Sequence, residues 1–232
     1  YGGSMNPATL ARTALFILLM AFIGLEELVR LLEHAGLFTL DPRTLPALYP
    51  LRVLAAGLLL YHFRAAYREI DFGQLRQTGH LLLSLVCGLA VFLLWIRMDT
   101  VLVSSPAPTG FNPLVFEDRA VQLAMSAVRL SGAVLVVPLM EELFWRSFLL
   151  RYLIDTSFLE VPVGQMKGVS FLACSLLFGL EHTYIAAGVM AGVAYTLLLY
   201  RTRSLACCIL AHALTNLLLG CYVLKTGAWR FW

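Results

Sequence analysis

Long apolar runs separated by short polar segments dominate the chain. We interpret seven of them as membrane-crossing helices, with six to eight a reasonable range, since a span needs about 20 apolar residues. The runs do not alternate with the period of two that barrel strands require, so helices must satisfy the backbone within lipid. The pattern predicts an all-α, polytopic transmembrane helical bundle. The runs are Leu10–Leu32, Leu45–Phe63, His80–Ile96, Ala120–Met140, Val169–Leu180, Ile185–Tyr200 and Ser204–Leu224.

The fourth run does not end at Met140, because residues Leu143–Ile154 continue it at helical spacing. This predicts either one long bent helix or two helices joined near Pro138, a natural kink. Two connections stand out between the runs: the charged segment Arg64–Gln77, and the stretch Val103–Pro113, rich in Pro, Ser and Gly. We expect the second to be the least ordered connection.

Composition agrees with a membrane protein. Of the 232 residues, 60% are hydrophobic and 13% are charged, whereas soluble domains carry about 25% charged residues. The net charge of +3 is small and the basic residues are scattered, so we expect no nucleic-acid partner. The five cysteines show no C-x-x-C spacing and are interpreted as small buried hydrophobes. The leading Tyr1–Ser4 resembles a cloning remnant, and we expect the native chain to begin at Met5.

Two adjacent carboxylates, Glu141 and Glu142, lie with Arg146 in the middle of an apolar run. A charge at bilayer depth costs about 2.5 to 3.5 kcal/mol on insertion scales, so such a group indicates a functional site. Glu142 and Arg146 are spaced i, i+4 and can form an ion pair. Glu141 points about 100° away around the helix. It is therefore free to face a cavity and polarise a water molecule.

Further polar groups occur on the later helices. His182 follows Phe178 by four residues, and Asn216 follows His212 by four, so the members of each pair share a helical face. His212 and Asn216 offer two neighbouring donors, as an oxyanion site requires. A single intramembrane histidine is often only an interhelical hydrogen-bond donor, but two histidines with a free carboxylate favour chemistry.

Other charged groups have more ordinary interpretations. The Glu142–Arg146 pair is interpreted as architectural. The group Glu26–Arg30 resembles it but lies at a helix end, where we expect an interfacial charge cluster. Glu181 faces a loop or pairs with an arginine such as Arg129. His34, His62 and His80 lie at span ends and receive no role.

The three motifs together resemble the signature of the CPBP intramembrane proteases. These comprise the type II CAAX prenyl endopeptidases, their bacterial relatives, and bacteriocin-processing or self-immunity (Abi) proteins. The motifs here are E-E-x-x-x-R at Glu141–Arg146, F-x-x-x-H at Phe178–His182 and H-x-x-x-N at His212–Asn216. The resemblance covers Pro138–Asn216. It divides the chain into N-terminal transmembrane helices (5–118), a catalytic core (119–224) and a tail (225–232), all within one integral membrane domain.

The resemblance implies about eight helices around a polar cavity, one more than the seven runs. The additional helix would be interfacial, between Leu37 and Tyr49. It also implies an endopeptidase acting on a membrane-associated substrate, lipidated or with a CAAX-like C-terminus. Glu141 and His182 would activate water, and His212 and Asn216 would stabilise the oxyanion. Glu142, Arg146 and Phe178 would support them.

The residues allow more than one assignment of cofactor and function. Carboxylate-activated water requires no cofactor, although Glu141, His182 and His212 could bind zinc. A slight excess of Lys and Arg on one side favours a cytoplasmic N-terminus and an active site near the cytosol. With the resemblance, this indicates a bacterial inner membrane. The alternatives are a non-catalytic scaffold or immunity factor of the same fold, and a proton-coupled transporter, for which half-repeats are lacking.

Overall fold

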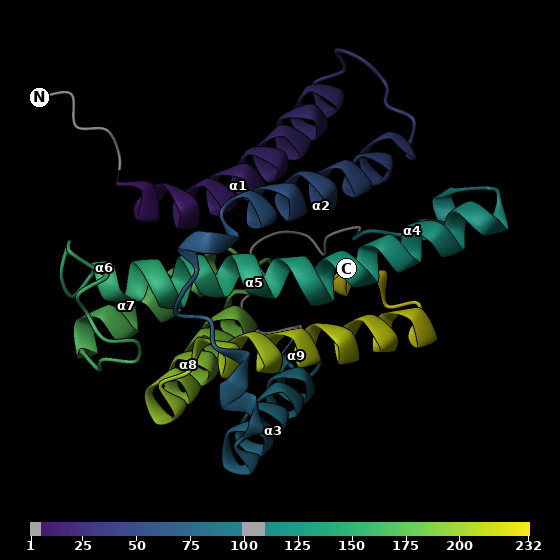
Figure 1. Cartoon of the computed structure of the whole chain (residues 1–232). Coiled ribbons are helices and arrows are strands. Elements are labelled where there is room, and N and C mark those ends of the chain that lie inside the picture. Colours follow the sequence, from purple (N-terminus) through teal and green to yellow (C-terminus); the bar gives the residue numbers. More distant parts are fainter. Residues whose placement is uncertain (1–5, 99–109) are drawn as a thin grey trace, which may run out of the picture.

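The computed structural model of the chain describes residues 6–98 and 110–232. Every regular element in these two ranges is a helix (Figure 1), which confirms the all-α prediction. The predicted cloning remnant Tyr1–Ser4 and most of Val103–Pro113 lie outside the described residues. The longer elements are α1 (Pro7–His34), α2 (Thr44–His62), α3 (Thr78–Trp95), a continuous helical run from Arg119 to Tyr152, α7 (Gly168–Leu180), α8 (Ile185–Thr202) and α9 (Leu205–Thr226).

Each of the seven apolar runs coincides with one of these helices. The interfacial helix implied between Leu37 and Tyr49 is not a separate element, because the chain is a loop up to Arg43 and α2 begins at Thr44. The other short elements of the described residues are 3-10 turns: η1 (Arg64–Ala66), η2 (Phe72–Arg76), η3 (Pro113–Val115) and η6 (Trp229–Phe231). The polar segment 64–77 is thus a chain of tight turns.

The run from Arg119 to Tyr152 is one helix rather than two. It starts where the Asp118 side chain accepts hydrogen bonds from the amides of Ala120 and Val121, which satisfies two free donors of the first turn. Pro138 has no amide hydrogen, and a π-helical segment immediately precedes its turn. The run consists of α4 (Arg119–Ser131), the π segment η4 (Gly132–Val136), α5 (Val137–Glu142), the π segment η5 (Leu143–Leu149) and α6 (Leu150–Tyr152).

This long helix divides the bundle. In Figure 1, α1 and α2 lie together on one side of it, and α3, α8 and α9 lie on the other. α7 and α8 form an antiparallel hairpin, and α9 packs against α3, α8 and the middle of the long helix. The middle of the long helix, which carries Glu141, is therefore surrounded by helices from both halves of the chain.

Glycine permits two of these helix contacts. A β-carbon at Gly179 would lie 2.8 Å from the backbone nitrogen of Val189, and one at Gly88 would lie 2.5 Å from the carbonyl oxygen of Ala211. Real β-carbons do not approach backbone atoms so closely. Small residues allow helices within membranes to approach one another, so Gly179 sets the spacing of α7 and α8, and Gly88 that of α3 and α9.

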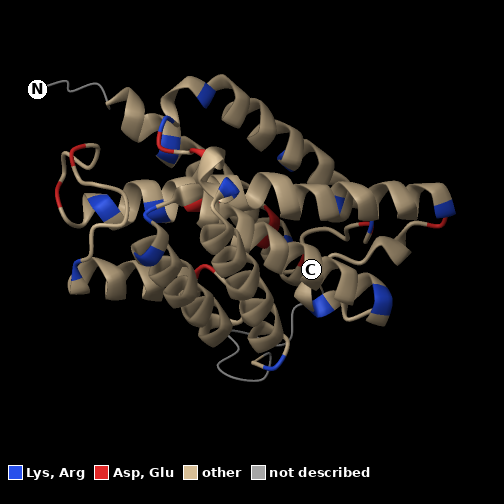
Figure 2. Cartoon of the chain, turned by 60° about the horizontal axis from the view of Figure 1, so that its bottom comes forward, with Lys and Arg blue, Asp and Glu red and all other residues tan. Residues whose placement is uncertain are grey.

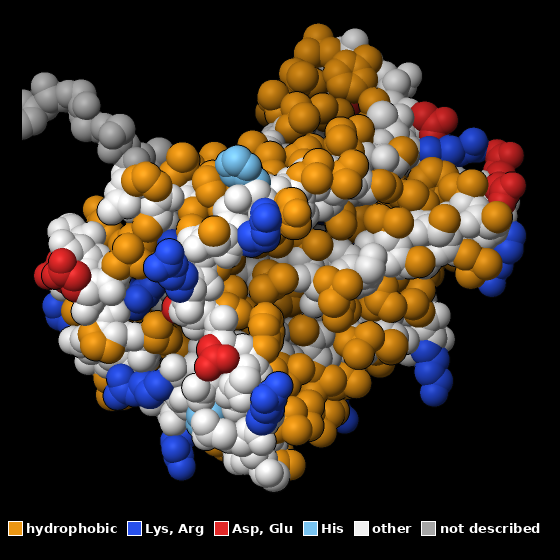
Figure 3. All heavy atoms as spheres, in the orientation of Figure 1, with side chains coloured by type: hydrophobic (Ala, Val, Ile, Leu, Met, Phe, Trp, Pro, Cys, Tyr) orange, Lys and Arg blue, Asp and Glu red, His pale blue; other side chains and the backbone are white. Residues whose placement is uncertain are grey.

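The outer surface is strongly apolar. Hydrophobic side chains cover most of the face in Figure 3, and many leucines are exposed. Charged residues gather in connections and at helix ends, with a smaller number inside the bundle (Figure 2). Such a surface fits lipid rather than water, and the chain is an integral membrane protein. Five described helices are long and apolar enough to cross a membrane: Thr44–His62, Thr78–Trp95, Arg119–Tyr152, Ile185–Thr202 and Leu205–Thr226.

A buried ion network joins the connection 64–77 to α1 and the long helix. Arg12, which is fully buried, contacts Glu69 at 2.6 Å and also donates to Ser147. Arg151 lies 3.7 Å from the same carboxylate, and Ser147 donates to it as well. Burial raises the pKa of Glu69, but the hydrogen bonds from Arg12 and Ser147 outweigh it and hold that pKa below its ordinary value.

Candidate active site

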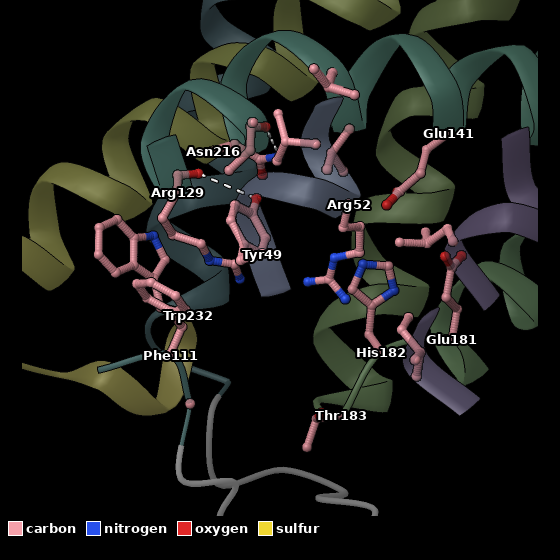
Figure 4. A pocket seen from close by; sticks show the side chains of 18 of the residues that line it. Tyr49, Arg52, Phe111, Arg129, Glu141, Glu181, His182, Thr183, Asn216 and Trp232 are labelled. Atoms are coloured by element: carbon pink, nitrogen blue, oxygen red, sulfur yellow. Dashed lines mark hydrogen bonds between the residues drawn. The ribbon is translucent and has the colours of Figure 1, made fainter. Parts of the chain in front are cut away.

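A cavity of about 700 Å³ lies between α1, α2 and the long helix, and α7, α8 and α9 also contribute to its lining. It receives side chains from all three motifs: Glu141 from α5, His182 from the turn between α7 and α8, and His212 and Asn216 from α9. Figure 4 shows Glu141, Glu181 and His182 toward one end of the view and Asn216 toward the other. The four residues that the sequence predicts as catalytic thus line one cavity.

Glu142 holds two partners with one oxygen. Its Oε1 accepts from Nη1 of Arg146 at 3.0 Å and from Nδ1 of His212 at 3.0 Å. The side chains of Glu142 and Arg146 are 0% exposed, so the predicted ion pair is formed in a fully buried setting. The contact with His212 is an additional finding. A carboxylate at Nδ1 fixes the proton there and leaves Nε2 directed toward the cavity.

Phe178 and Tyr195 complete the packing around this pair. The guanidinium carbon of Arg146 lies 4.4 Å from the centre of the Phe178 ring. The rings of Tyr195 and His212 stack with their centres 5.0 Å apart. The hydroxyl of Tyr195 donates to Thr215. These contacts restrict the rotation of Arg146 and His212, so the supporting position that the sequence predicts for Phe178 agrees with its contacts.

Glu141 differs from its neighbour because it makes no hydrogen bond within the described chain. It is 5% exposed, its Oε2 is buried without a partner, and that oxygen lies 3.9 Å from Nε2 of His212. A buried polar group without a hydrogen bond costs about 1 to 3 kcal/mol, and more when it is charged. A water molecule or a substrate in the cavity is the available partner for this carboxyl group.

His182 presents one nitrogen to the cavity. Its Nδ1 donates to the carbonyl of Phe178 at 2.7 Å, because a carbonyl oxygen can only accept. Nε2 is then the free nitrogen, and the rings of Trp95 and Phe178 hold the imidazole in place. His182 can therefore accept a hydrogen bond from water while it is neutral.

Asn216 is anchored and keeps one donor. Its amide nitrogen donates to the carbonyl of Ala133 at 2.8 Å, in the π segment before Pro138. Since Pro138 lacks an amide hydrogen, a carbonyl in the preceding turn loses its helical donor, and this side chain takes up the carbonyl of Ala133. The second N–H of Asn216 remains for a ligand, on the same face as His212.

Two neighbouring groups make contacts that the sequence did not predict. Glu181 accepts from the indole nitrogen of Trp145 at 2.9 Å, and it does not pair with Arg129. The cluster Glu26–Arg30, expected at an interface, lines the cavity, where Glu26 pairs with Arg52 at 3.4 Å. No motif marks Arg52 or Arg129 as cavity residues, because α2 carries no recognisable signature and the contact depends on how α2 packs against α1 and α4.

The possible zinc ligands lie around one cavity. Among the described residues, no group of three or more His, Cys, Asp or Glu side chains is arranged so that it could hold a metal ion. Glu141, His182 and His212 share the cavity, and Nδ1 of both histidines is bonded within the protein, which leaves Nε2 as the remaining nitrogen of each ring.

The fold and the cavity define a class: an integral membrane helical protein with a buried carboxylate, two histidines and an asparagine facing one intramembrane cavity. Residues 123–218 match the family described as Type II CAAX prenyl endopeptidase Rce1-like. This segment contains all three motifs, so the resemblance is confirmed over these residues. No curated protein and no solved structure matches the chain.

Proposed function

We propose that the chain is an intramembrane endopeptidase that hydrolyses a peptide bond near the C-terminus of a membrane-associated protein or peptide. The observation that carries this proposal is the unpaired carboxyl group of Glu141, buried in the cavity beside His212. The endopeptidase family matched over residues 123–218 supports the same reaction class.

Glu141 is the proposed general base. It takes one proton from a water molecule whose other hydrogen is held by Nε2 of His182. The water oxygen then bonds to the carbonyl carbon of the substrate, and the carbonyl electron pair moves to oxygen. When the tetrahedral intermediate collapses, the C–N bond breaks and Glu141 returns its proton to the leaving amine. The products are a carboxylic acid and an amine.

His212 and Asn216 are the proposed donors to the oxyanion. Asn216 has one free N–H, and His212 donates from Nε2 when its ring carries a second proton. The carboxylate of Glu142 accepts from Nδ1 at 3.0 Å and holds the ring in this orientation. Donors held in place before the reaction stabilise the charge that develops on oxygen.

We also propose that the protein lies in a bacterial inner membrane with the active site nearer the cytosolic side. The support is the slight excess of Lys and Arg on the side of the N-terminus and of Arg151. The substrate would be a protein or peptide held at the bilayer, lipidated or not, and the proposed chemistry needs no cofactor.

The experiment is incubation of purified protein with prenylated and unprenylated C-terminal peptides, with and without a chelator, read by mass spectrometry. We expect cleavage by the native chain. Glu141→Gln should reduce the rate by about 100- to 10,000-fold, the range for loss of a general base. Glu160→Gln, an exposed carboxylate in the connection after α6, is the matched control. Cleavage of neither peptide would favour the non-catalytic scaffold or immunity factor.

A further inference from the structure

We infer that the cavity contains a cationic subsite, made by Arg129 and Arg52 on the ring of Tyr49, that binds the C-terminal carboxylate of the substrate. This inference rests on the proposed function, because it names the substrate group that enters the same cavity. Arg129, Arg52 and Tyr49 all line that cavity. Figure 4 shows Arg129 and Tyr49 together, away from Glu141.

The two guanidinium groups contact the same aromatic ring. The guanidinium carbon of Arg129 lies 4.6 Å from the centre of the Tyr49 ring, and that of Arg52 lies 4.9 Å from it. Arginine stacks on aromatic faces while its N–H groups stay free to donate at the edge of the plane. The ring therefore orients two cations and does not neutralise either.

The two cations are not matched by two carboxylates. Arg52 pairs with Glu26 at 3.4 Å. Within residues 6–98 and 110–232, the Arg129 side chain contacts the rings of Tyr49 and Phe111, and its Nε is buried without a hydrogen-bond partner. An uncompensated charge within a membrane-spanning helix is costly and indicates a functional group. An anion with two acceptor oxygens is the complement of this guanidinium, because it can accept from two N–H groups at once.

The position of Arg129 fits a peptide whose chain also reaches Glu141. Both residues lie on the same continuous helix, twelve positions apart. At 1.5 Å per residue this is about 18 Å along the axis, and extended peptide spans about 3.3 to 3.6 Å per residue. A substrate with its carboxylate at Arg129 would place a bond about five residues from its end at Glu141. The side chain of Arg129 can extend toward Glu141 and so shorten the distance that the peptide must span.

The walls beside Arg129 suit the last side chains of such a peptide. Phe111 and Trp232 line the cavity there, with ring centres 6.1 Å apart, and Phe111 also contacts Tyr49 at 5.6 Å. Aromatic walls accept apolar side chains while the guanidinium holds the terminal charge. A lipid phosphate shares the anionic chemistry, but only a peptide bound at Arg129 also delivers a scissile bond to Glu141.

The test measures binding without turnover, so that it does not depend on cleavage. Glu141→Gln protein in neutral-lipid nanodiscs is titrated with one fluorescent peptide in two forms, with a free C-terminal carboxylate and with a C-terminal amide. A hydrogen bond to a charged group is worth about 1.5 to 3 kcal/mol. We therefore expect the acid to bind about 10- to 100-fold more tightly than the amide.

Variants at Arg129 test whether this residue causes the tighter binding of the acid peptide. Adding Arg129→Gln should make the two peptides equal, and Arg129→Lys should retain part of the preference, since the charge remains. Arg119→Gln, an exposed arginine at the start of the same helix, should keep the full preference. Equal binding of acid and amide to the parent protein, or a preference that survives Arg129→Gln, would overturn the inference.

Two further outcomes separate this inference from its alternatives. If anionic lipid abolishes the acid preference and binds in an Arg129-dependent way, the subsite holds a lipid phosphate and the inference is wrong. If the native chain cleaves acid and amide peptides with equal kcat/KM, the endopeptidase stands and the carboxylate subsite fails. Acid-selective binding without any cleavage would support the subsite and reject the enzyme.

Discussion

At the scale of single residues, two adjacent glutamates have different surroundings. Glu142 is buried with Arg146 and His212, whereas Glu141 has no hydrogen bond to any described residue and faces the cavity. The i, i+4 spacing was sufficient to predict the Glu142–Arg146 pair. It could not predict the contact with His212, because that residue lies on another helix and reaches Glu142 only through the packing of α9 against the long helix.

This contact makes Glu142 a positioning residue in our account. Glu142→Gln should lower kcat by about 100-fold or more, by analogy with loss of the carboxylate that orients a catalytic histidine, and should leave KM nearly unchanged. Steady-state kinetics on the peptide substrates measure both constants.

Because Glu142→Gln also leaves Arg146 without its charge partner, thermal unfolding of the variant must be followed in parallel. Arg146→Lys provides the comparison, since it keeps the charge and leaves Glu142 available to His212. A Glu142→Gln protein that is folded and has native kcat would contradict the positioning role.

At the scale of elements, connections decide how the helices meet. The seven apolar runs, the continuation of the fourth run through the glutamates, and the polar connection 64–77 were all predictable from hydrophobic pattern. The tertiary role of that connection was not. Its Glu69 joins Arg12 in α1 to Ser147 in the long helix, and no local pattern pairs residues so far apart in the sequence.

The ionised form of Glu69 should stabilise the fold. Its pKa is lowered in the folded protein, so its contribution is complete above the unfolded pKa of about 4.3 and is lost as pH falls through the folded value. We expect Glu69→Gln to unfold several degrees lower at pH 7. Melting curves of the native and Glu69→Gln proteins should be recorded in detergent from pH 7 to pH 3. The difference between their melting temperatures should narrow only below about pH 4.3.

The matched control for this pH experiment is Asp155→Asn, at an exposed position in the connection after α6. It should melt like the native chain throughout the range. If the native and Glu69→Gln proteins melt at the same temperature at pH 7, or if the difference in melting temperature grows toward acid pH, ionised Glu69 does not stabilise the fold.

The α7–α8 hairpin should be sensitive to side-chain size at Gly179. A leucine there must displace backbone atoms of α8, because a β-carbon would already lie 2.9 Å from the carbonyl oxygen of Ile185. Since His182 follows in the turn, we expect Gly179→Leu to lower both the melting temperature and the cleavage rate. Gly168→Ala, where a β-carbon meets nothing within 4 Å, should change neither. Native melting of Gly179→Leu would show that the hairpin tolerates a wider spacing.

At the scale of the whole molecule, the bundle brings the residues predicted to be catalytic into one cavity from separate parts of the chain. The motifs were sufficient to predict Glu141, His182, His212 and Asn216 as a group. The side of the cavity formed by α1 and α2 could not be predicted, since these helices carry ordinary apolar sequence and lie outside residues 123–218, the part that matches the family. Arg52, Arg129 and Tyr49 are brought together only by tertiary packing.

The most direct measurement of the central claim is peptide hydrolysis in water enriched in ¹⁸O, followed by mass spectrometry. The native chain is predicted to release two fragments, with ¹⁸O in the newly formed carboxyl group, and Glu141→Gln protein of native melting temperature is predicted to release almost none. Native-rate cleavage by Glu141→Gln, or no cleavage by the native chain, would contradict the account.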